Sequence, residues 1–334
     1  MRIKILYINT PNQDYLPDSI LLGLKSLVDL FDVDEYPVKH ILYKEDKSDN
    51  NNIRGFGFTL YNLLSNSLKK EFKHDFGKKN ISQYDYVIFS SIHRQYGIYY
   101  QLYPYLEKNK TLIFDGEDIP NIFPFSGYFF KKPYYWFIPR PHRYFKYYKR
   151  EITEKTLYYL HYLLVPQFIG KHLKLPKNIL PTSFSIPSEK VIKSIPVKTK
   201  LFPRHIVDEE VCNNVPDSVS KYAFTNELEY YNDLQTSKYG ITTKRAGWDC
   251  LRHYEIAANG AVICFKNLQL KPTYCAPHGL IPDFNCISYT DYNDLMSQIN
   301  KLSDADYDNL QERSLSWVNE NSCEQRVQKI FNLL

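Results

Sequence analysis

Cysteine, methionine and glycine are all scarce in this sequence: its 334 residues include six, two and twelve of them, respectively. The cysteines form no C-x-x-C pair, and we expect no zinc site. They lie in segments with the pattern of core strands or helices, so we expect reduced structural thiols in a cytosolic protein. The six are Cys212, Cys250, Cys264, Cys275, Cys286 and Cys323.

Long hydrophobic runs are also absent, because no segment reaches about 18 consecutive apolar residues. The N-terminal MRIKILYI runs directly into a strand-like pattern and lacks the long apolar stretch and small-residue cleavage site of a secretory signal. We therefore expect a soluble chain without a membrane-spanning helix. Its length and its 43% content of hydrophobic residues predict two domains that bury a core without disulfides.

The net charge of +5 divides unevenly along the chain. Residues 1–190 contain 27 lysines and arginines against 19 acidic residues, whereas residues 191–334 contain 15 against 18. A basic first half and a slightly acidic second half indicate two domains with different partners. Nucleic-acid binding usually needs a denser basic field, so we do not expect a nucleic-acid partner.

The first half alternates short apolar strands with amphipathic helices, which predicts a parallel α/β sheet. Helices are expected from about residue 18 to 30 and from 99 to 108. The predicted strands are Ile3–Ile8, Phe31–Tyr36, Tyr86–Ser90, Thr111–Phe114 and Tyr162–Val165.

The second half repeats this scheme after a lysine- and proline-rich stretch at 181–200. We place the domain boundary there and expect one domain over residues 1–185 and another over 186–334. Strands are predicted at 222–224, 239–242, 261–265 and 286–289. Helices are predicted at 227–236, 248–258, 291–302, 304–319 and 322–333.

The most informative segment is TKRAGWDCLRHYEIAANGAVICF, residues 243–265. A helix that begins after a glycine-containing loop presents free N–H groups to a phosphate. Lys244, Arg245 and Arg252 would add charge-assisted donors to a diphosphate. Gly247 and Asp249, in the loop before the helix, complete the candidate donor-binding set.

Glu255 lies on the same predicted helix, three residues after Arg252. A carboxylate at this place can accept hydrogen bonds from both hydroxyls of a ribose. The alternative is that Glu255 and Arg252 form only an ion pair on the helix surface. Gly260 is expected to end the helix, since glycine tolerates the left-handed conformation found there.

The stretch Arg252-His-Tyr-Glu255-Ile-Ala-Ala258-Asn-Gly260 resembles the pattern R-x-x-E-x-x-A-x-G of GT-B glycosyltransferases, where it precedes a buried strand. The following APHGLIPDFNCISY resembles the family's downstream loop and last strand, and WVNENS with its closing helix resembles the family's C-terminal helices. The resemblance covers about 110 residues, from roughly Tyr222 to the end. The first half is similar only in its alternation of strands and helices.

This resemblance implies a GT-B-like fold of two facing Rossmann-like domains with a cleft between them. It implies that the second domain holds a nucleotide sugar, with Glu255 on the ribose and Arg252 near the phosphates, and that the first holds the acceptor. It also implies that neither a bound divalent metal nor another cofactor is required. Many retaining members carry a second glutamate eight residues before the first, but this sequence has Gly247 there. The stereochemistry therefore stays open.

An inverting transfer needs a general base, which we expect in a loop after a strand of the first domain. The loop after the first strand offers Asp14, while Asp18 is expected to cap the following helix. The loop after YVIFS offers His93. The DGED stretch after TLIF offers Asp115 and Asp118, whose clustering can raise a carboxyl pKa. DGED could alternatively hold a divalent metal, and each candidate could instead be structural.

Residues 128–150 combine seven lysines and arginines with eleven aromatics. Three interpretations stay open: packing of the aromatics on the first domain, contact with a membrane surface or lipid-linked acceptor, and binding of single-stranded nucleic acid. The first two are favoured over the third.

Together these features predict a cytoplasmic glycosyltransferase that moves a sugar from a nucleotide sugar to an acceptor hydroxyl. The acceptor is expected to be a glycan or a surface-polysaccharide precursor, with peripheral membrane contact through residues 128–150. The alternatives are a nucleotide-sugar epimerase of the same fold and a non-catalytic nucleotide-sugar-binding protein.

Overall fold

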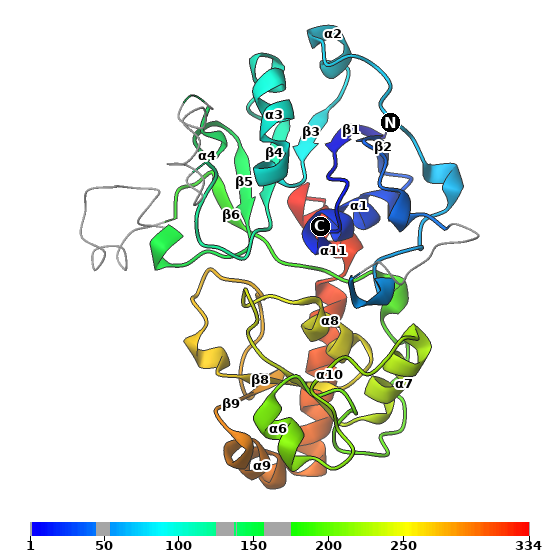
Figure 1. Cartoon of the computed structure of the whole chain (residues 1–334), viewed down its shortest axis with the longest axis vertical. Coiled ribbons are helices and arrows are strands. Elements are labelled where there is room, and N and C mark those ends of the chain that lie inside the picture. The colour runs from blue at the N-terminus through cyan, green and yellow to red at the C-terminus, as the bar shows by residue number, and fades with distance from the viewer. Residues whose placement is uncertain (1, 45–53, 125–136, 138, 157–174, 334) are drawn as a thin grey trace. The chain divides into compact units, whose positions relative to one another are not determined.

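The computed structural model describes residues 2–44, 54–124, 137, 139–156 and 175–333 (Figure 1). The chain forms two compact units, which are described one at a time. Unit 1 comprises residues 1–49, 60–183 and 272–276, and unit 2 comprises 50–59, 184–271 and 277–334. The sequence indicated one boundary near residue 185 and gave no sign of the two short segments, 50–59 and 272–276, that belong to the other unit.

Unit 1 contains a six-stranded parallel sheet in the order β2-β1-β3-β4-β5-β6. Its first four strands confirm the predicted ones. Strands β3 and β4 are short apolar runs with mostly buried side chains, as expected of strands covered on both faces, whereas β2 alternates buried and half-buried residues. The strands are β1 (Ile3–Ile8), β2 (Phe31–Tyr36), β3 (Tyr86–Phe89), β4 (Thr111–Asp115), β5 (Lys146–Lys149) and β6 (Ile179–Pro181).

Two longer helices of unit 1 differ in position from the predicted ones. Helix α1 (Tyr15–Ser26) begins three residues earlier than expected, so Asp14 and not Asp18 occupies its N-cap position. Helix α3 (Ile92–Leu102) begins directly after β3, seven residues before the predicted start. Short helices α2 (Lys78–Ile81) and α4 (Pro141–Tyr144) complete the described part of this unit.

Strand β5 is the main departure from the sequence prediction, because it lies inside the aromatic and basic segment 128–150. Tyr147 and Lys149 have no exposed surface and Arg150 is 1% exposed. Lys149 and Arg150 are therefore internal, whereas Arg143 and Lys146 are exposed. Only part of the segment's cations thus fits the packing interpretation. Residues 125–136 and 138, like the strand predicted at 162–165, lie outside the described residues.

Unit 2 is built on a three-stranded parallel sheet, β7-β8-β9, with helices around it (Figure 1). The predicted strand at 222–224 does not form; Tyr222 and Phe224 instead pack their rings against Tyr230. The strands are β7 (Tyr239–Thr242), β8 (Val262–Lys266) and β9 (Cys286–Tyr289). The helices are α6 (Glu209–Asn214), α7 (Glu227–Thr236), α8 (Leu251–Ala258), α9 (Tyr292–Lys301), α10 (Asp304–Glu320) and α11 (Cys323–Ile330).

The predicted end of α8 and the predicted free thiols are confirmed, whereas α8 begins at Leu251, three residues after the predicted start. Gly260, just beyond α8, has a φ of 71° in the left-handed region, as expected of a residue that ends a helix. All six cysteines are free thiols. Within the described residues, no helix is long and apolar enough to cross a membrane.

Helix α8 packs so closely on β7 that a methyl group at Gly240 would lie 2.5 Å from Cγ2 of Ile256, which is itself 1% exposed. We expect Gly240→Ala to lower the free energy of unfolding by about 1–3 kcal/mol, the usual result of overpacking a core. Urea denaturation followed by circular dichroism measures this.

Gly97→Ala is the matched control. Gly97 lies within α3, and nothing lies within 4 Å of a methyl group placed there. This variant should be neutral or more stable by up to about 1 kcal/mol, because alanine favours helix over glycine. Equal losses of stability in both variants would contradict the close packing of α8 on β7.

Candidate functional site

Three loops at the carboxyl edge of the unit 1 sheet meet through Arg94. The Arg94 guanidinium lies 2.9 Å from the Asp14 carboxylate, in the loop after β1, and 3.7 Å from the Glu117 carboxylate, in the loop after β4. Arg94 itself is in the first turn of α3, directly after β3. The structure therefore brings together the three loops in which the sequence predicted a general base.

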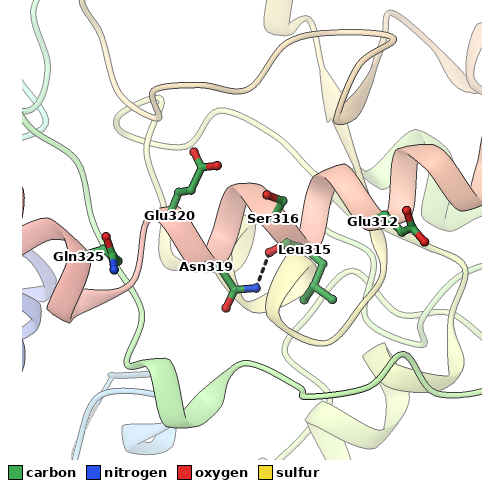
Figure 2. A pocket seen from close by; sticks show the side chains of 6 residues that line it. All are labelled: Glu312, Leu315, Ser316, Asn319, Glu320 and Gln325. Carbon is green, nitrogen blue, oxygen red and sulfur yellow. Dashed lines mark hydrogen bonds between the residues drawn. The ribbon is translucent and has the colours of Figure 1, made fainter. Parts of the chain in front are cut away.

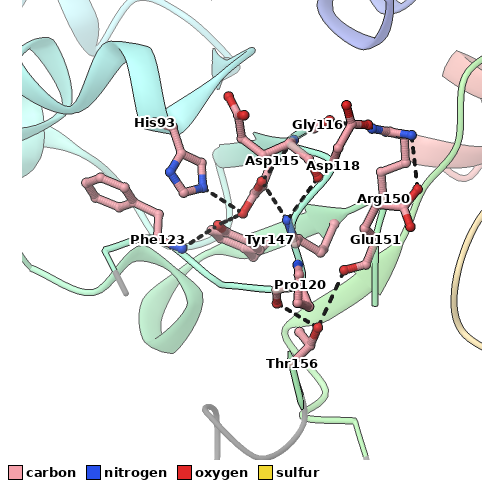
Figure 3. Close-up of polar contacts among 12 residues, drawn as sticks. His93, Asp115, Gly116, Asp118, Pro120, Phe123, Tyr147, Arg150, Glu151 and Thr156 are labelled. Atoms are coloured by element: carbon pink, nitrogen blue, oxygen red, sulfur yellow. Dashed lines mark hydrogen bonds and ion pairs between the residues drawn. The ribbon is translucent and has the colours of Figure 1, made fainter. Parts of the chain in front are cut away.

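The centre of this edge is Asp115, the last residue of β4, whose side chain has no exposed surface (Figure 3). Its Oδ1 lies 2.9 Å from Nζ of Lys149. Its Oδ2 lies 3.1 Å from Nε2 of His93 and accepts a hydrogen bond from the Tyr147 hydroxyl. Burial would raise the pKa of Asp115, but Lys149 and His93 outweigh it and hold the pKa well below its ordinary value. Asp115 is thus a fixed negative charge and a poor proton acceptor.

His93 is held by this carboxylate and keeps contact with solvent, since its side chain is 12% exposed. An ionised carboxylate only accepts hydrogen bonds, so Nε2 of His93 carries a hydrogen, and Nδ1 is the acceptor nitrogen of the neutral ring. The ring of Phe123 meets the imidazole edge to face, with 5.4 Å between the ring centroids. A histidine oriented by a buried carboxylate is the arrangement of a general base.

Asp118 has a different role, because it pairs with the buried guanidinium of Arg150. Arg150 also bonds to Glu151 at 3.1 Å and donates to the carbonyl of Gly116 (Figure 3). The two aspartates of DGED therefore face different cations and do not converge on a metal. Across the described ranges, no group of three histidine, cysteine, aspartate or glutamate side chains could hold a metal ion.

Asp14 is the remaining predicted base. Its side chain is 11% exposed, and burial raises its pKa to about 6 against the opposing effect of Arg94. Asp18, the expected helix cap, lies in the first turn of α1, where its carboxylate pairs with Lys39 at 3.1 Å. Asp14 is therefore a carboxyl group at this edge whose pKa approaches neutrality.

In unit 2, the predicted diphosphate-binding cations gather near the start of α8. Lys244 and Arg245 are exposed, with Nζ of Lys244 5.2 Å above the Trp248 ring, and Arg252 is partly exposed in the first turn. Within the part of the chain that the structure describes, the Arg252 side chain makes no hydrogen bond or ion pair. These cations are thus available to an anion at a helix N-terminus.

The two loop residues of the predicted donor set are structural. Gly247 is buried and its carbonyl accepts from the backbone N–H of Arg245, which closes a tight turn. The Asp249 carboxylate accepts from the backbone N–H of Phe184 at 2.7 Å and from the Tyr254 hydroxyl at 3.1 Å. Asp249 therefore fixes the start of α8 and does not present a free carboxylate.

Glu255 is buried, with 7% of its surface exposed, so the alternative of a helix-surface ion pair with Arg252 is wrong. One carboxylate oxygen accepts from the Thr59 hydroxyl at 2.6 Å, and the other accepts from the Tyr230 hydroxyl at 2.8 Å. Burial raises the pKa of Glu255, while these hydroxyls and Arg252 oppose the rise. The carboxylate thus already accepts hydrogen bonds from two hydroxyl groups, as it would from a bound ribose.

Sequence reasoning missed Tyr147, Lys149, Thr59 and Tyr230. The first two lie on a strand hidden among aromatics, and Thr59 is 196 residues from Glu255 in the chain.

Two surface hollows of unit 2 lie elsewhere. One, of about 520 Å³, runs along α10 and α11 and is lined by Glu312, Leu315, Ser316, Asn319, Glu320 and Gln325 (Figure 2). Its lining has two carboxylates and no cation, so it does not suit an anionic donor. The other, of about 670 Å³, includes Lys200, which pairs with Asp233.

Comparisons with known proteins show the fold. No family model and no curated protein matches the sequence. The structure is similar to Anabaena HepE, solved in complex with UDP-glucose, at 8% identity over all of both chains with a TM-score of 0.51. It is also similar to a Rickettsia africae glycosyltransferase (11% identity, 99% of this chain and 97% of that one, TM-score 0.53). Sucrose-phosphate synthase from Thermosynechococcus elongatus matches over 99% and 98% of the two chains, at 11% identity and a TM-score of 0.51. The chain therefore has the GT-B glycosyltransferase fold predicted from the sequence.

The raised pKa of Asp14 has a consequence for stability. Because the folded state keeps this proton up to about pH 6, whereas the ordinary pKa is 3.8, ionisation of Asp14 lowers stability as the pH rises between these values. Asp14→Asn removes the effect. We expect the free energy of unfolding of this variant, minus that of the parent protein, to rise by up to about 3 kcal/mol between pH 4 and pH 7.

Carbon-13 NMR of the Asp14 carboxyl group gives the pKa directly. A midpoint near pH 6 is expected, and Arg94→Gln should move it upward because Arg94 lowers this pKa. A midpoint near the ordinary value, with no pH dependence of the stability difference, would contradict the account of Asp14.

Proposed function

We propose that this protein is a glycosyltransferase that moves a sugar from a nucleoside-diphosphate sugar to an acceptor hydroxyl. The observation that carries the proposal is the group of exposed cations near the start of α8. It occurs in a chain whose whole length shares the fold of HepE, which binds UDP-glucose in its solved complex. Free N–H groups at a helix start, beside cations that form no ion pair within the described residues, favour a diphosphate.

The donor is bound by unit 2 in this proposal. Arg252, Lys244 and Arg245 neutralise the diphosphate, so no divalent metal is needed for that purpose. Glu255 accepts the ribose hydroxyls. A carboxylate has about four lone-pair directions, so its present bonds to Thr59 and Tyr230 leave acceptor capacity for a ligand that displaces or joins them. Gly247 and Asp249 shape the loop and the helix start that present these groups.

The proton is handled by unit 1. His93 takes the acceptor's hydroxyl proton at Nδ1 while the acceptor oxygen forms its bond to the anomeric carbon and the nucleoside diphosphate leaves. Asp115 keeps the imidazole in the required tautomer and stabilises the imidazolium, because its charge is fixed by Lys149. Asp14, with a pKa of about 6, is the second candidate for this role. Asp118 is occupied by Arg150.

The acceptor in this proposal is a glycan or a polysaccharide precursor, with the reaction in the cytoplasm or at its membrane surface. Within segment 128–150, Lys149 and Arg150 are buried and face carboxylates. A lipid-linked acceptor would therefore contact exposed cations such as Arg143 and Lys146.

Calorimetric titration with UDP, GDP, CDP and dTDP, each with and without Mg²⁺, tests donor binding. One of them should bind, and Glu255→Ala should weaken that binding by about 1–3 kcal/mol, the cost of losing hydrogen bonds to a charged group. Glu255→Gln serves as a second variant that keeps an acceptor oxygen for Thr59 or Tyr230 and so protects the fold.

Glu312→Ala, in the acidic hollow on α10, is the matched control and should leave affinity unchanged. Equal affinity of the folded Glu255 variants and the parent protein would contradict the ribose assignment. Conversion of the donor sugar with no acceptor present would instead indicate an epimerase, and binding without turnover of any sugar would indicate a non-catalytic protein.

A further inference from the structure

A cysteine and a histidine lie together at the first turn of α8 and have no role in the proposed transfer. Cys250 is the N-cap residue of this helix and is partly exposed, whereas Cys264, Cys275, Cys286 and Cys323 are buried. Its Sγ lies 3.8 Å from Nδ1 of His253, within reach of a hydrogen bond to sulfur.

The tautomer of His253 is fixed by a main-chain carbonyl. Nε2 lies 2.9 Å from the carbonyl oxygen of Trp248, which can only accept, so Nε2 carries a hydrogen. Nδ1 of the neutral ring is then the proton acceptor, and it faces both Cys250 and the Thr242 hydroxyl at 3.0 Å. A thiol, a neighbouring imidazole and a group that orients the imidazole are the parts of an activated cysteine nucleophile.

The local charges act in the same direction. Burial would raise the pKa of Cys250, but His253 and Arg252 lower it to about 7, against the smaller opposing effect of Asp249. Burial would lower the pKa of His253, but Cys250 and Asp249 raise it. The N-terminus of α8 adds a partial positive charge beside the sulfur. Both shifts favour transfer of the thiol proton to the imidazole.

We propose that Cys250 and His253 form a thiolate–imidazolium pair that makes Cys250 a site of covalent modification by soft electrophiles and peroxides. This inference does not depend on the proposed transferase activity. With hydrogen peroxide, Sγ attacks one oxygen, the S–O bond forms and the O–O bond breaks. The leaving hydroxide takes the proton from Nδ1 of His253 and departs as water. The sulfur is oxidised by two electrons to a sulfenic acid, and the peroxide is reduced.

The same chain contains a cysteine with which the reactivity of Cys250 can be compared. Cys212 is the other partly exposed cysteine, and its Sγ accepts a hydrogen bond from the Ser218 hydroxyl at 3.3 Å. It lies in α6, and the structure places no histidine beside it among the contacts of its sulfur. A difference in reactivity between Cys250 and Cys212 therefore reports the pairing with His253, since both are partly exposed.

The test is the rate of alkylation by iodoacetamide, a reaction in which the thiolate displaces iodide. The intact chain is treated at pH 5 to 9, and peptide mass spectrometry then gives the rate for each cysteine. At pH 7 we expect Cys250 to react at least ten times faster than Cys212, with a midpoint near pH 7 in its rate. After treatment with hydrogen peroxide, dimedone should label Cys250 in preference to Cys212.

His253→Gln separates the pair from simple exposure, because a glutamine amide can still donate to the Trp248 carbonyl but cannot take the thiol proton. The Cys250 rate at pH 7 should fall about tenfold in this variant, while the Cys212 rate stays unchanged. Thr242→Val, which keeps His253, is a second variant and should retain fast alkylation. Equal rates for Cys250 and Cys212 in the parent protein, or an unchanged Cys250 rate in folded His253→Gln, would overturn the proposal.

Discussion

The fold of unit 1 depends on satisfying one buried charge, the carboxylate of Asp115. An ionised carboxylate without partners inside a protein costs several kcal/mol, so the neighbouring elements must supply cations and hydrogen-bond donors. Lys149 and Tyr147 supply them from β5, and His93 supplies one from α3. This requirement ties β4 to the next strand and to the helix after β3, and the same contacts that stabilise the sheet edge orient the histidine.

Pairing of cations, more than their number, distinguishes the two units. The first half of the sequence is the basic one, yet its site cations Arg94, Lys149 and Arg150 are all paired with carboxylates. The second half is slightly acidic, yet Lys244 and Arg252, near the start of α8, are not in ion pairs within the residues described. The cations proposed to bind the donor diphosphate therefore lie in the half of the chain whose net charge is slightly acidic.

The sequence was sufficient to predict those elements whose hydrophobic pattern is unambiguous. Strands β3 and β4 contain short runs of apolar residues, and helix α7 was predicted with its observed ends because its cap and periodicity agree. Strand β5 was missed because its buried lysine depends on a partner 34 residues away, which local pattern cannot reveal. The strand predicted at 222–224 failed for the converse reason, since Tyr222 packs on rings from a helix and from a distant segment.

In the candidate site, too, some features could be predicted from local sequence and others depend on distant contacts. Local chemistry was enough to select His93 and the cations around α8 as candidates, because strand ends and helix starts are recognisable in a sequence. It could not separate Asp115 from Asp118 as bases, since their difference lies in the cations that each one meets. Nor could it show that Glu255 already accepts hydrogen bonds from the hydroxyls of Thr59 and Tyr230, which come from segments distant in the chain.

The most direct test of the central claim is the turnover of a His93→Asn variant. The measurement is the steady-state release of nucleoside diphosphate from the donor sugar, with water or a glycan as acceptor. His74→Gln, an exposed histidine outside the site, is the control. The account predicts that His93→Asn lowers kcat by about 10²–10⁴ with donor affinity unchanged, as expected for loss of a general base, while His74→Gln has no effect. Turnover of His93→Asn at the parent rate would contradict it.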